Sequence, residues 1–312
     1  MSAIDPKLFE TPDTERPQSV AVLGAALDLG TTRRGVDMGP SAIRYSGLAE
    51  RLDSMGVDVV DGGNVATTMP EIAPIRHERA RYLPAILATC GQLAERVVQF
   101  TGEGHFPLVL GGDHSIAMGT LAGLSKAHGS GGVIWVDAHG DANTPDTTPS
   151  GNVHGMPLAA ALGECGFSID GFESPPWIDP SRVALVGVRQ LDEGEKALIR
   201  KLGLQVLTMA EIDRRGIAGV MHKALDIAAG PGFVHLSFDM DALEPEIAPG
   251  VGTPVRGGLS YREAHLAMEL AAESRQLTSM EIVEVNPILD HANATGALAV
   301  ELVASALGAR IF

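Results

Sequence analysis

The chain has 312 residues and a formal net charge of −16 at pH 7. A chain of this length buries one large core or two modest ones, and so acidic a protein lacks the basic face that nucleic-acid phosphates require. No apolar run approaches the ~20 residues that span a bilayer, and the polar N-terminus is unlike a signal peptide. The two cysteines, Cys90 and Cys165, are too few for a disulfide framework. We therefore expect a cytoplasmic protein that binds neither nucleic acid nor membrane.

Strands and helices are predicted to alternate after a flexible tail over residues 1–18. Short β-branched runs predict strands at 19–25, 58–61, 107–110, 133–136, 182–188, 205–208, 234–238 and 281–285. Longer amphipathic patterns predict helices near 41–55, 80–100, 116–128, 192–202, 209–215, 217–229, 260–273 and 297–307. Strands separated by helices predict an α/β fold, with a parallel sheet of about eight strands and helices on both faces. Residues 19–312 are expected to form a single catalytic domain.

The stretch after the predicted strand 133–136 carries residue types that bind metal ions. Asp137, His139 and Asp141 fall at every second position, and Gly140 allows the backbone to turn tightly. Two carboxylates this close repel each other unless a cation lies between them or one takes up a proton. A calcium loop is the alternative, but the central histidine and the lack of a glutamate at the twelfth position argue against it. The stretch therefore predicts a transition-metal site.

Three other strand ends are predicted to complete this site, because ligands of parallel sheets lie beyond the carboxyl ends of the strands. The polar residues at those ends are His114 after strand 107–110, Asp239 and Asp241 after strand 234–238, and Glu284 at the end of strand 281–285. The four aspartates would carry four negative charges, which two divalent cations would neutralise. A ligand set rich in oxygen, with two imidazoles and no thiolate, favours manganese or magnesium over structural zinc.

Several motifs resemble those of a known enzyme family. The segments Gly111-Gly112-Asp113-His114-Ser115, Asp137-Ala138-His139-Gly140-Asp141 and Ser237-Phe238-Asp239-Met240-Asp241 resemble the three signatures of the ureohydrolases. The loop Ser150-Gly151-Asn152-Val153-His154-Gly155 resembles that of arginases rather than that of agmatinases. Arginases are also matched by Gly35-Val36-Asp37-Met38-Gly39-Pro40, Gly252-Thr253-Pro254-Val255 and Glu284-Val285-Asn286-Pro287. The resemblance runs from about Val20 to the C-terminus and is strongest to bacterial arginases.

This resemblance implies an arginase/deacetylase-like three-layer fold and two manganese ions per subunit. His114, Asp137, Asp141 and Asp239 would bind one ion, and His139, Asp137, Asp239 and Asp241 the other, with Asp137 and Asp239 bridging. A hydroxide between the metals would attack the guanidinium carbon of L-arginine and give L-ornithine and urea. Arginases of this kind also imply a homo-oligomer, either a trimer or a hexamer.

The resemblance also assigns residues to the substrate. Glu284 would hold the guanidinium, with Thr253 close by. The α-carboxylate would be bound by Asn143, Thr148 and Ser150, and the α-ammonium would be surrounded by Asn152, Asp192 and Glu195. Asp141 is expected to relay a proton from the bridging hydroxide, and His154 to act as an acid or proton shuttle. His235 lies two residues before Ser237 and is expected to pack near the site without binding metal.

Two other functions fit part of the same pattern. Another ureohydrolase, such as an agmatinase or a guanidinobutyrase, would keep the metals and bind a different substrate tail; agmatine lacks the carboxylate that Asn143 and Ser150 would hold. A noncatalytic metal-bound scaffold would keep the ligands as well, but it would have no need of Glu284.

Overall fold

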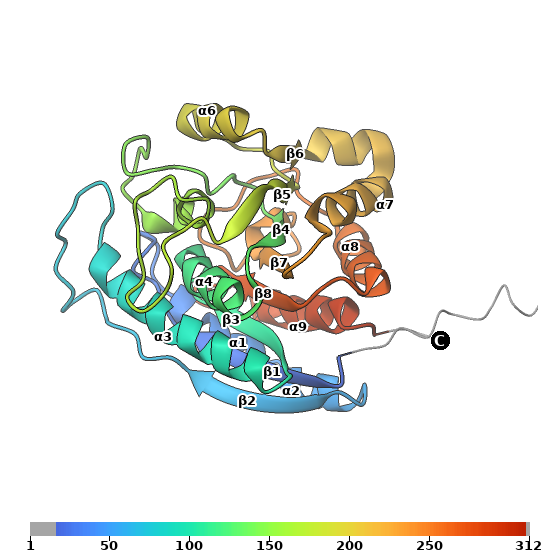
Figure 1. Cartoon of the computed structure of the whole chain (residues 1–312). Helices are drawn as coiled ribbons and strands as arrows, with labels where there is room; N and C mark the ends of the chain where they lie inside the picture. Colours follow the sequence, from blue (N-terminus) through green and yellow to red (C-terminus); the bar gives the residue numbers. More distant parts are fainter. Residues whose placement is uncertain (1–16, 310–312) are drawn as a thin grey trace, which may run out of the picture.

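The strands form one sheet in the computed structural model, which describes residues 17–309. All neighbouring strands pair in parallel, in the order β2-β1-β3-β8-β7-β4-β5-β6 (Figure 1). Their bounds are β1 Ser19–Ala25, β2 Asp58–Asn64, β3 Phe106–Gly111, β4 Gly131–Val136, β5 Ile178–Val186, β6 Gln205–Leu207, β7 Val234–Asp239 and β8 Ser279–Val283. The predicted tail lies outside the described residues except for its last two positions.

The burial of the strands follows their place in the sheet. Every residue of the central strands β3, β8, β7 and β4 is buried, as expected for parallel strands covered on both faces. In β4, Val133 and Trp135 pack into one core while Ile134 and Val136 pack into the other, because successive side chains point to opposite faces. The edge strands β2 and β6 are partly exposed.

Helices cover both faces of the sheet and give three layers (Figure 1). Buried side chains of α3, α4 and α5 belong to one core, and those of α1, α7, α8 and α9 to the other. The bounds are α1 Gly39–Tyr45, α2 Leu48–Asp53, α3 Leu83–Gly102, α4 Ala117–His128, α5 Pro157–Ala161, α6 Glu193–Leu202, α7 Met209–Ala228, α8 Tyr261–Ser274 and α9 Ala294–Ala306. The predicted α/β class and its parallel eight-stranded sheet are confirmed.

Some predicted boundaries are wrong, and glycine accounts for one of them, whereas the predicted break at residue 216 is confirmed. The predicted helix 41–55 is split at Gly47, which has a φ of 83°. The helices expected at 209–215 and 217–229 are the two halves of α7, which is kinked where Gly216 has a φ of 72°. The last strand ends at Val283, so Glu284 follows β8 directly instead of lying within it. Helix α5 had no clear pattern in the sequence.

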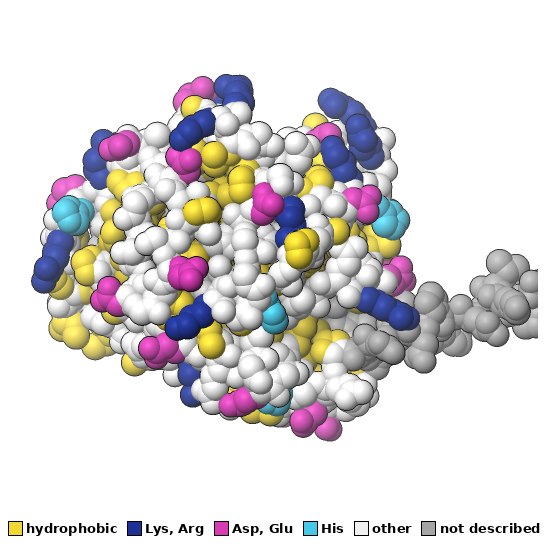
Figure 2. Space-filling model, in the orientation of Figure 1, with side chains coloured by type: hydrophobic (Ala, Val, Ile, Leu, Met, Phe, Trp, Pro, Cys, Tyr) yellow, Lys and Arg dark blue, Asp and Glu magenta, His cyan; other side chains and the backbone are white. Residues whose placement is uncertain are grey.

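Lys and Arg side chains lie in separate small groups on the face drawn in Figure 2. No helix among residues 17–309 is long and apolar enough to cross a bilayer.

Candidate metal centre

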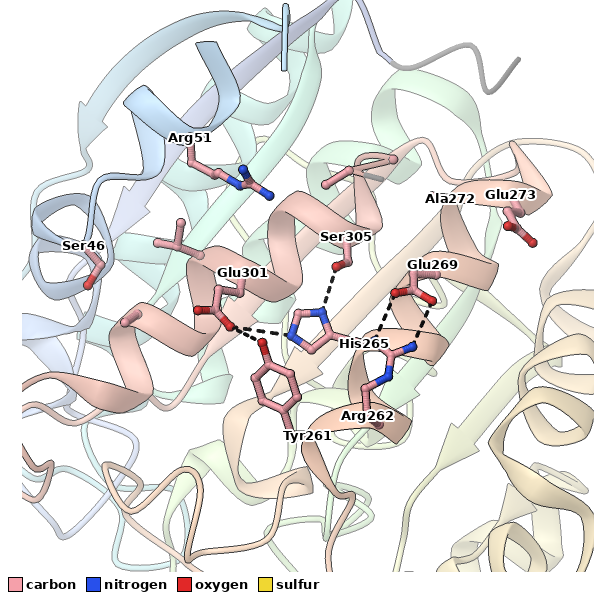
Figure 3. A pocket seen from close by; sticks show the side chains of 14 residues that line it. Ser46, Arg51, Tyr261, Arg262, His265, Glu269, Ala272, Glu273, Glu301 and Ser305 are labelled. Atoms are coloured by element: carbon pink, nitrogen blue, oxygen red, sulfur yellow. Dashed lines mark hydrogen bonds and ion pairs between the residues drawn. The ribbon is translucent and has the colours of Figure 1, made fainter. Parts of the chain in front are cut away.

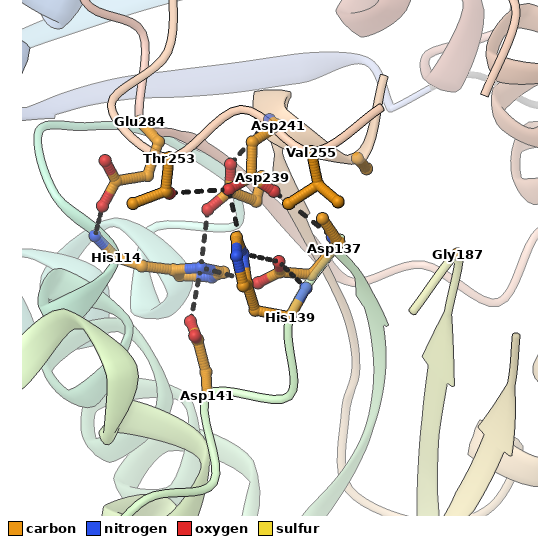
Figure 4. Close-up of polar contacts among 12 residues, drawn as sticks. His114, Asp137, His139, Asp141, Gly187, Asp239, Asp241, Thr253, Val255 and Glu284 are labelled. Carbon is orange, nitrogen blue, oxygen red and sulfur yellow. Dashed lines mark hydrogen bonds and ion pairs between the residues drawn. The ribbon is translucent and has the colours of Figure 1, made fainter. Parts of the chain in front are cut away.

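The predicted ligands meet at the carboxyl edge of the sheet because their strands are neighbours. Strands β3, β8, β7 and β4 lie side by side in the middle of the sheet, and each is followed at once by polar residues. Their parallel register brings these strand ends to one rim. Figure 4 shows the resulting cluster of aspartates and histidines, with Glu284 and Thr253 beside it.

His114 forms the centre of a first group of ligands. Its Nδ1 lies 2.9 Å from Asp141 Oδ2, 3.2 Å from Asp239 Oδ2 and 3.3 Å from Asp137 Oδ2. The histidine ring is 1% exposed, yet its Nδ1 makes no hydrogen bond of acceptable geometry. A buried nitrogen left without a hydrogen bond among three carboxylates fits a cation held by all four groups.

A second group shares Asp137 with the first. His139 Nδ1 lies 3.1 Å from Asp241 Oδ2 and 3.4 Å from Asp137 Oδ1. Asp137 therefore turns one oxygen to each histidine, which is the arrangement of a bridging ligand. The potential ligand atoms of Asp137, His139 and Asp241 lie within 4.8 Å of one another, as do those of His114, Asp137 and Asp141. Among the residues that the structure describes, these two groups are the clusters of three or more acidic or histidine side chains close enough to hold a metal ion.

The backbone is strained where two of the functional side chains enter the site. Asp141 has a φ of 49° and Glu284 a φ of 64°, which is the left-handed region that residues with a side chain rarely adopt. The sequence placed the tight turn at Gly140 instead. A Cβ at Gly140 would lie 2.6 Å from Cδ2 of Leu191, the end of a side chain that can move aside, so space alone does not demand glycine there. The turn itself falls on Asp141.

The segment that presents His114 is fixed by close backbone packing. A Cβ on Gly112 would lie 1.8 Å from the carbonyl oxygen of Leu27, so only glycine fits there. Asp113 caps the short 3-10 helix His114–Ile116 by accepting from the Ser115 amide, and it also accepts from the Gly30 amide at 2.8 Å. Asp113 thus holds the loop in place, and its neighbour His114 faces the carboxylates.

Glu284 has one carboxylate oxygen in use and one without a partner. Oε1 accepts from the His114 backbone amide at 2.9 Å and lies 3.0 Å from Nδ1 of His154. Oε2 is buried and has no hydrogen-bond partner. A buried carboxylate oxygen without a partner is costly unless a donor or a cation reaches it. The arrangement leaves a place for a cationic group directly beside the metal-binding cluster.

The electrostatics of the cluster also favour bound cations. Burial raises the pKa of Asp141 to about 7, and the charge of Asp137 adds to this effect. Burial and the charges of Asp241 and Asp137 raise the pKa of Asp239 well above its usual range. Burial opposes the charged form of Asp137 too, but His114 and His139 lower its pKa well below its usual value. Divalent cations would replace the protons that this crowding otherwise demands.

The chain resembles known proteins over nearly its whole length. The sequence model described as the arginase family matches residues 18–308. The chain belongs to the arginase family. The arginase of Bacillus subtilis (strain 168) is 52% identical over 297 residues, which cover 94% of this chain and 99% of that protein.

Solved arginase structures have the same fold. The native arginase of Bacillus caldovelox is 50% identical and superposes with a TM-score of 0.89 over 95% of this chain and 100% of that one. Entamoeba histolytica arginase in complex with L-ornithine is 29% identical, with a TM-score of 0.84 over 94% of this chain and 100% of that one. The protein is accordingly a hydrolase of the arginase family, which is metal-dependent.

The residues expected to bind the rest of the substrate lie on loops beside the cluster. Asn143 is buried, and its Nδ2 donates to Asp192 Oδ2 at 2.9 Å. Thr148 Oγ1 accepts from the Ser150 and Gly151 amides at 3.3 and 3.0 Å. Thr253 Oγ1 donates to Asp241 Oδ2 at 2.9 Å, which ties it to the metal-binding group.

The other expected substrate contacts also have partners within the protein. Glu195 is the third residue of a capping box with Asp192, and its Oε2 accepts from the Asp192 amide at 2.7 Å. Its Oε1 accepts from the Ala142 amide at 3.3 Å. Asn152 Oδ1 accepts from Arg81. Ser150 is exposed, and its Oγ accepts from the Asn152 amide at 3.2 Å. Glu195 therefore has a structural use whether or not it also reaches a substrate.

The sequence reasoning missed Arg189, which holds the loops around the second group of ligands. Its guanidinium donates to the carbonyl oxygens of Asp241 and Val255, each at 2.7 Å. It also donates to the carbonyls of Gly187, Ala242 and Leu243. One side chain thus fixes the segment after β7 and the segment next to Thr253. Its place just beyond β5, on the same rim, was the one available signal.

Proposed function

We propose that the protein is an arginase that hydrolyses L-arginine to L-ornithine and urea at a site for two divalent cations. The observation that carries this proposal is the buried, unpartnered Oε2 of Glu284 beside the group formed around His114. A guanidinium is a planar cation that pairs well with a carboxylate. Glu284 would therefore hold the guanidinium of the substrate next to the metal-binding cluster.

The donor set fits the metal ions that the family implies. His114, Asp137, Asp141 and Asp239 would hold one ion, and His139, Asp137, Asp239 and Asp241 the other. Two such cations supply a hydroxide near neutral pH, which is the nucleophile that the poorly electrophilic guanidinium requires. We propose manganese as the metal, because the ligands are oxygen and imidazole without a thiolate.

Two side chains, His154 and Asp141, would transfer protons during the reaction. His154 Nδ1 lies 3.0 Å from Glu284 Oε1, so its Nε2 is the ring nitrogen left for proton exchange with the leaving amine. Burial alone would lower the pKa of His154, but the charge and hydrogen bond of Glu284 raise it to about 9. A histidine of this pKa is protonated at neutral pH and could donate. Asp141 would relay the other proton.

Recognition of arginine as a whole amino acid is assigned to the loops. We propose that Asn143, Thr148 and Ser150 bind the α-carboxylate, and that Asn152, Asp192 and Glu195 surround the α-ammonium. Thr253 would stand next to the guanidinium. The Entamoeba histolytica arginase, which was solved with L-ornithine, supports an amino-acid ligand for this site. A homo-oligomeric state, trimeric or hexameric, and a cytoplasmic location belong to the same proposal.

The test is urea release from L-arginine by protein loaded with manganese. Agmatine and 4-guanidinobutyrate serve as competing substrates, because each lacks one of the two groups at the α-carbon. We expect turnover of arginine to exceed that of both. Faster turnover of agmatine would favour an agmatinase, and two bound manganese ions without hydrolysis of any of the three would favour a noncatalytic scaffold.

A further inference from the structure

A buried hydrogen-bond chain leads from His114 into the middle of the sheet. His114 Nε2 lies 2.8 Å from Ser237 Oγ, which donates to Glu281 Oε1 at 2.8 Å. Ser237 and Glu281 are both 0% exposed, and they lie opposite each other on the paired strands β7 and β8. The chain thus connects the ring that faces the metal-binding cluster with a carboxylate outside that cluster.

The direction of these hydrogen bonds follows from the groups involved. An ionised carboxylate only accepts, so the hydroxyl proton of Ser237 must point to Glu281. The oxygen of Ser237 is then left to accept from His114, which requires a proton on Nε2. With Nε2 protonated, the neutral ring has its lone pair on Nδ1, the atom that faces three carboxylates. That is the ring form a metal ion needs.

His235 supports the ionised form of Glu281. Its Nε2 lies 3.4 Å from Glu281 Oε1, and its Nδ1 lies 2.9 Å from Ser279 Oγ. Burial alone would raise the pKa of Glu281, but the neighbouring His235 outweighs this and lowers it below its usual value. The ring of Trp135 stacks on the ring of His114, with centroids 4.2 Å apart and an interplanar angle of 9°. This stacking limits the rotation of the His114 ring.

We propose that Glu281, acting through Ser237, is a positioning residue that keeps His114 in the ring form able to bind a cation through Nδ1. Glu281 is placed to act only through His114, since the ring nitrogens of His139 have no part in this chain of contacts. The inference rests on the two-cation site of the proposed function but not on its substrate. It therefore concerns one of the two cations more than the other.

The decisive variant is Glu281→Gln, which keeps the shape but gives the side chain a donor. With its amide N–H toward Ser237, the glutamine would turn the hydroxyl around, so that it donates to Nε2 and moves the ring proton to Nδ1. With its amide oxygen toward Ser237, it would still accept from the hydroxyl, but without the negative charge that strengthens this hydrogen bond. We expect manganese affinity at the His114 group to fall about 10–100-fold, as for other groups that orient a metal ligand. The affinity at the His139 group should change much less.

Manganese titration followed by electron paramagnetic resonance measures how many manganese ions bind and whether they lie close enough to couple. At a concentration that fills both sites of the unaltered protein, Glu281→Gln should give the spectrum of an isolated ion instead of a coupled pair. Ser237→Ala should have the same effect, and the double variant should lose little more, because one chain of contacts carries both effects. Glu281→Asp, which keeps the acceptor, should recover part of the affinity.

A matched control is Ser305→Ala, which removes the contact of Ser305 Oγ with His265 Nδ1, 2.9 Å long and also buried. It should leave both manganese affinities unchanged. If Glu281→Gln and Ser237→Ala both bind two ions with unaltered affinities, the positioning role is wrong. If Glu281→Gln does not fold, Ser237→Ala decides by the same criterion. If the unaltered protein takes up no manganese, it is the proposed function that fails.

Discussion

The backbone amide of His114 donates to the side chain of Glu284 at 2.9 Å, across 170 residues of sequence. One bond thus joins the segment that presents a proposed metal ligand to the carboxylate proposed to hold the guanidinium. The distance between cation and substrate is therefore set by the protein before either one binds. Such preorganisation matters because a misplacement of reacting groups by about 1 Å can cost roughly 100-fold in rate.

Replacement of Glu284 by glutamine should remove activity with little change in the fold. The amide keeps an oxygen for the His114 amide but loses the charge that would pair with the guanidinium. Loss of one partner of a buried ion pair costs about 3–5 kcal/mol, which corresponds to roughly 10²–10⁴-fold in kcat/KM. Urea release from L-arginine measures this.

The control for Glu284→Gln is Glu301→Gln, a charge-to-amide change on α9 where the carboxylate accepts from the Tyr261 hydroxyl at 2.7 Å. Its kcat/KM should stay close to that of the unaltered protein. A Glu284→Gln protein with kcat/KM within tenfold of the original would show that the guanidinium is held elsewhere.

Removal of metal should lower the stability of the fold. Four aspartates crowd the rim, and cations that bind only the folded state stabilise it by mass action. At a free manganese concentration one hundred times the dissociation constant of an ion, the binding of that ion would contribute about 2.7 kcal/mol. Thermal unfolding with manganese and with a chelator measures the difference. In Asp137→Ala, which lacks the shared ligand, the melting temperature should no longer respond to manganese.

Replacement of Arg189 by lysine should weaken both the fold and the metal site. One ammonium cannot reach the carbonyls of Asp241, Val255 and their neighbours together. Since hydrogen bonds from charged donors contribute about 1.5–3 kcal/mol each and some will remain, we expect a loss of about 2–4 kcal/mol. Chemical denaturation and manganese titration are the measurements.

Arg182 offers the matched control for Arg189. It also donates to backbone carbonyls, those of Ala228, Pro231 and Phe233, but at the opposite end of β7. Arg182→Lys should lose stability and keep its manganese affinity. Equal manganese affinities in the two lysine variants would mean that Arg189 does not position Asp241.

His265 should contribute a loss of stability in mild acid to the metal-free protein, opposite in sign to the contribution of Asp141 and His154, whose pKa values are raised. This histidine lines a cavity of about 1080 Å³ between α2, α8 and α9, with Tyr261, Arg262, Glu269 and Glu301 around it (Figure 3). Burial lowers its pKa, and the charge of Glu301 offsets this only in part. The unfolded chain takes up a proton near pH 6.5, so it binds more protons than the folded state below that pH and stability declines there.

Urea-induced unfolding at pH 7.5 and at pH 5.5, with a chelator present, measures this contribution. His265→Gln lacks the titrating ring, so it should lose less stability than the unaltered protein between the two pH values. The same loss in both proteins would assign the acid sensitivity to other groups.

The sequence predicted the sheet well because parallel strands buried on both faces leave a clear signature. β1 matches its predicted bounds at both ends, and β4 and β7 depart by one or two residues at an end. The residues placed at the strand ends, such as His114, Asp137 and Asp239, lie together for the same reason. A side chain that directly follows a central parallel strand lies at the carboxyl edge of the sheet, close to those that follow the neighbouring strands.

What the sequence could not predict depends on contacts between distant segments. The left-handed backbone at Asp141 and Glu284 has no local signal, since glycine at 140 pointed to a different position. The five carbonyls around Arg189 come from three loops. Nor could the sequence reveal that Glu281 meets Ser237, because the partner strand of β7 was unknown. Local sequence patterns predict where strands and helices form, but contacts such as that between Ser237 and Glu281 depend on which strands pair.

The order of the strands has a consequence for the newly made chain. β7 and β8 are synthesised last, yet they lie between β3 and β4. While the first two thirds of the protein emerge from a ribosome, the loops after β3 and β4 have no strand between them to fix their distance. The metal centre would be complete only after β7 and β8 have inserted between β3 and β4, so binding of the ions would report completed assembly of the whole sheet.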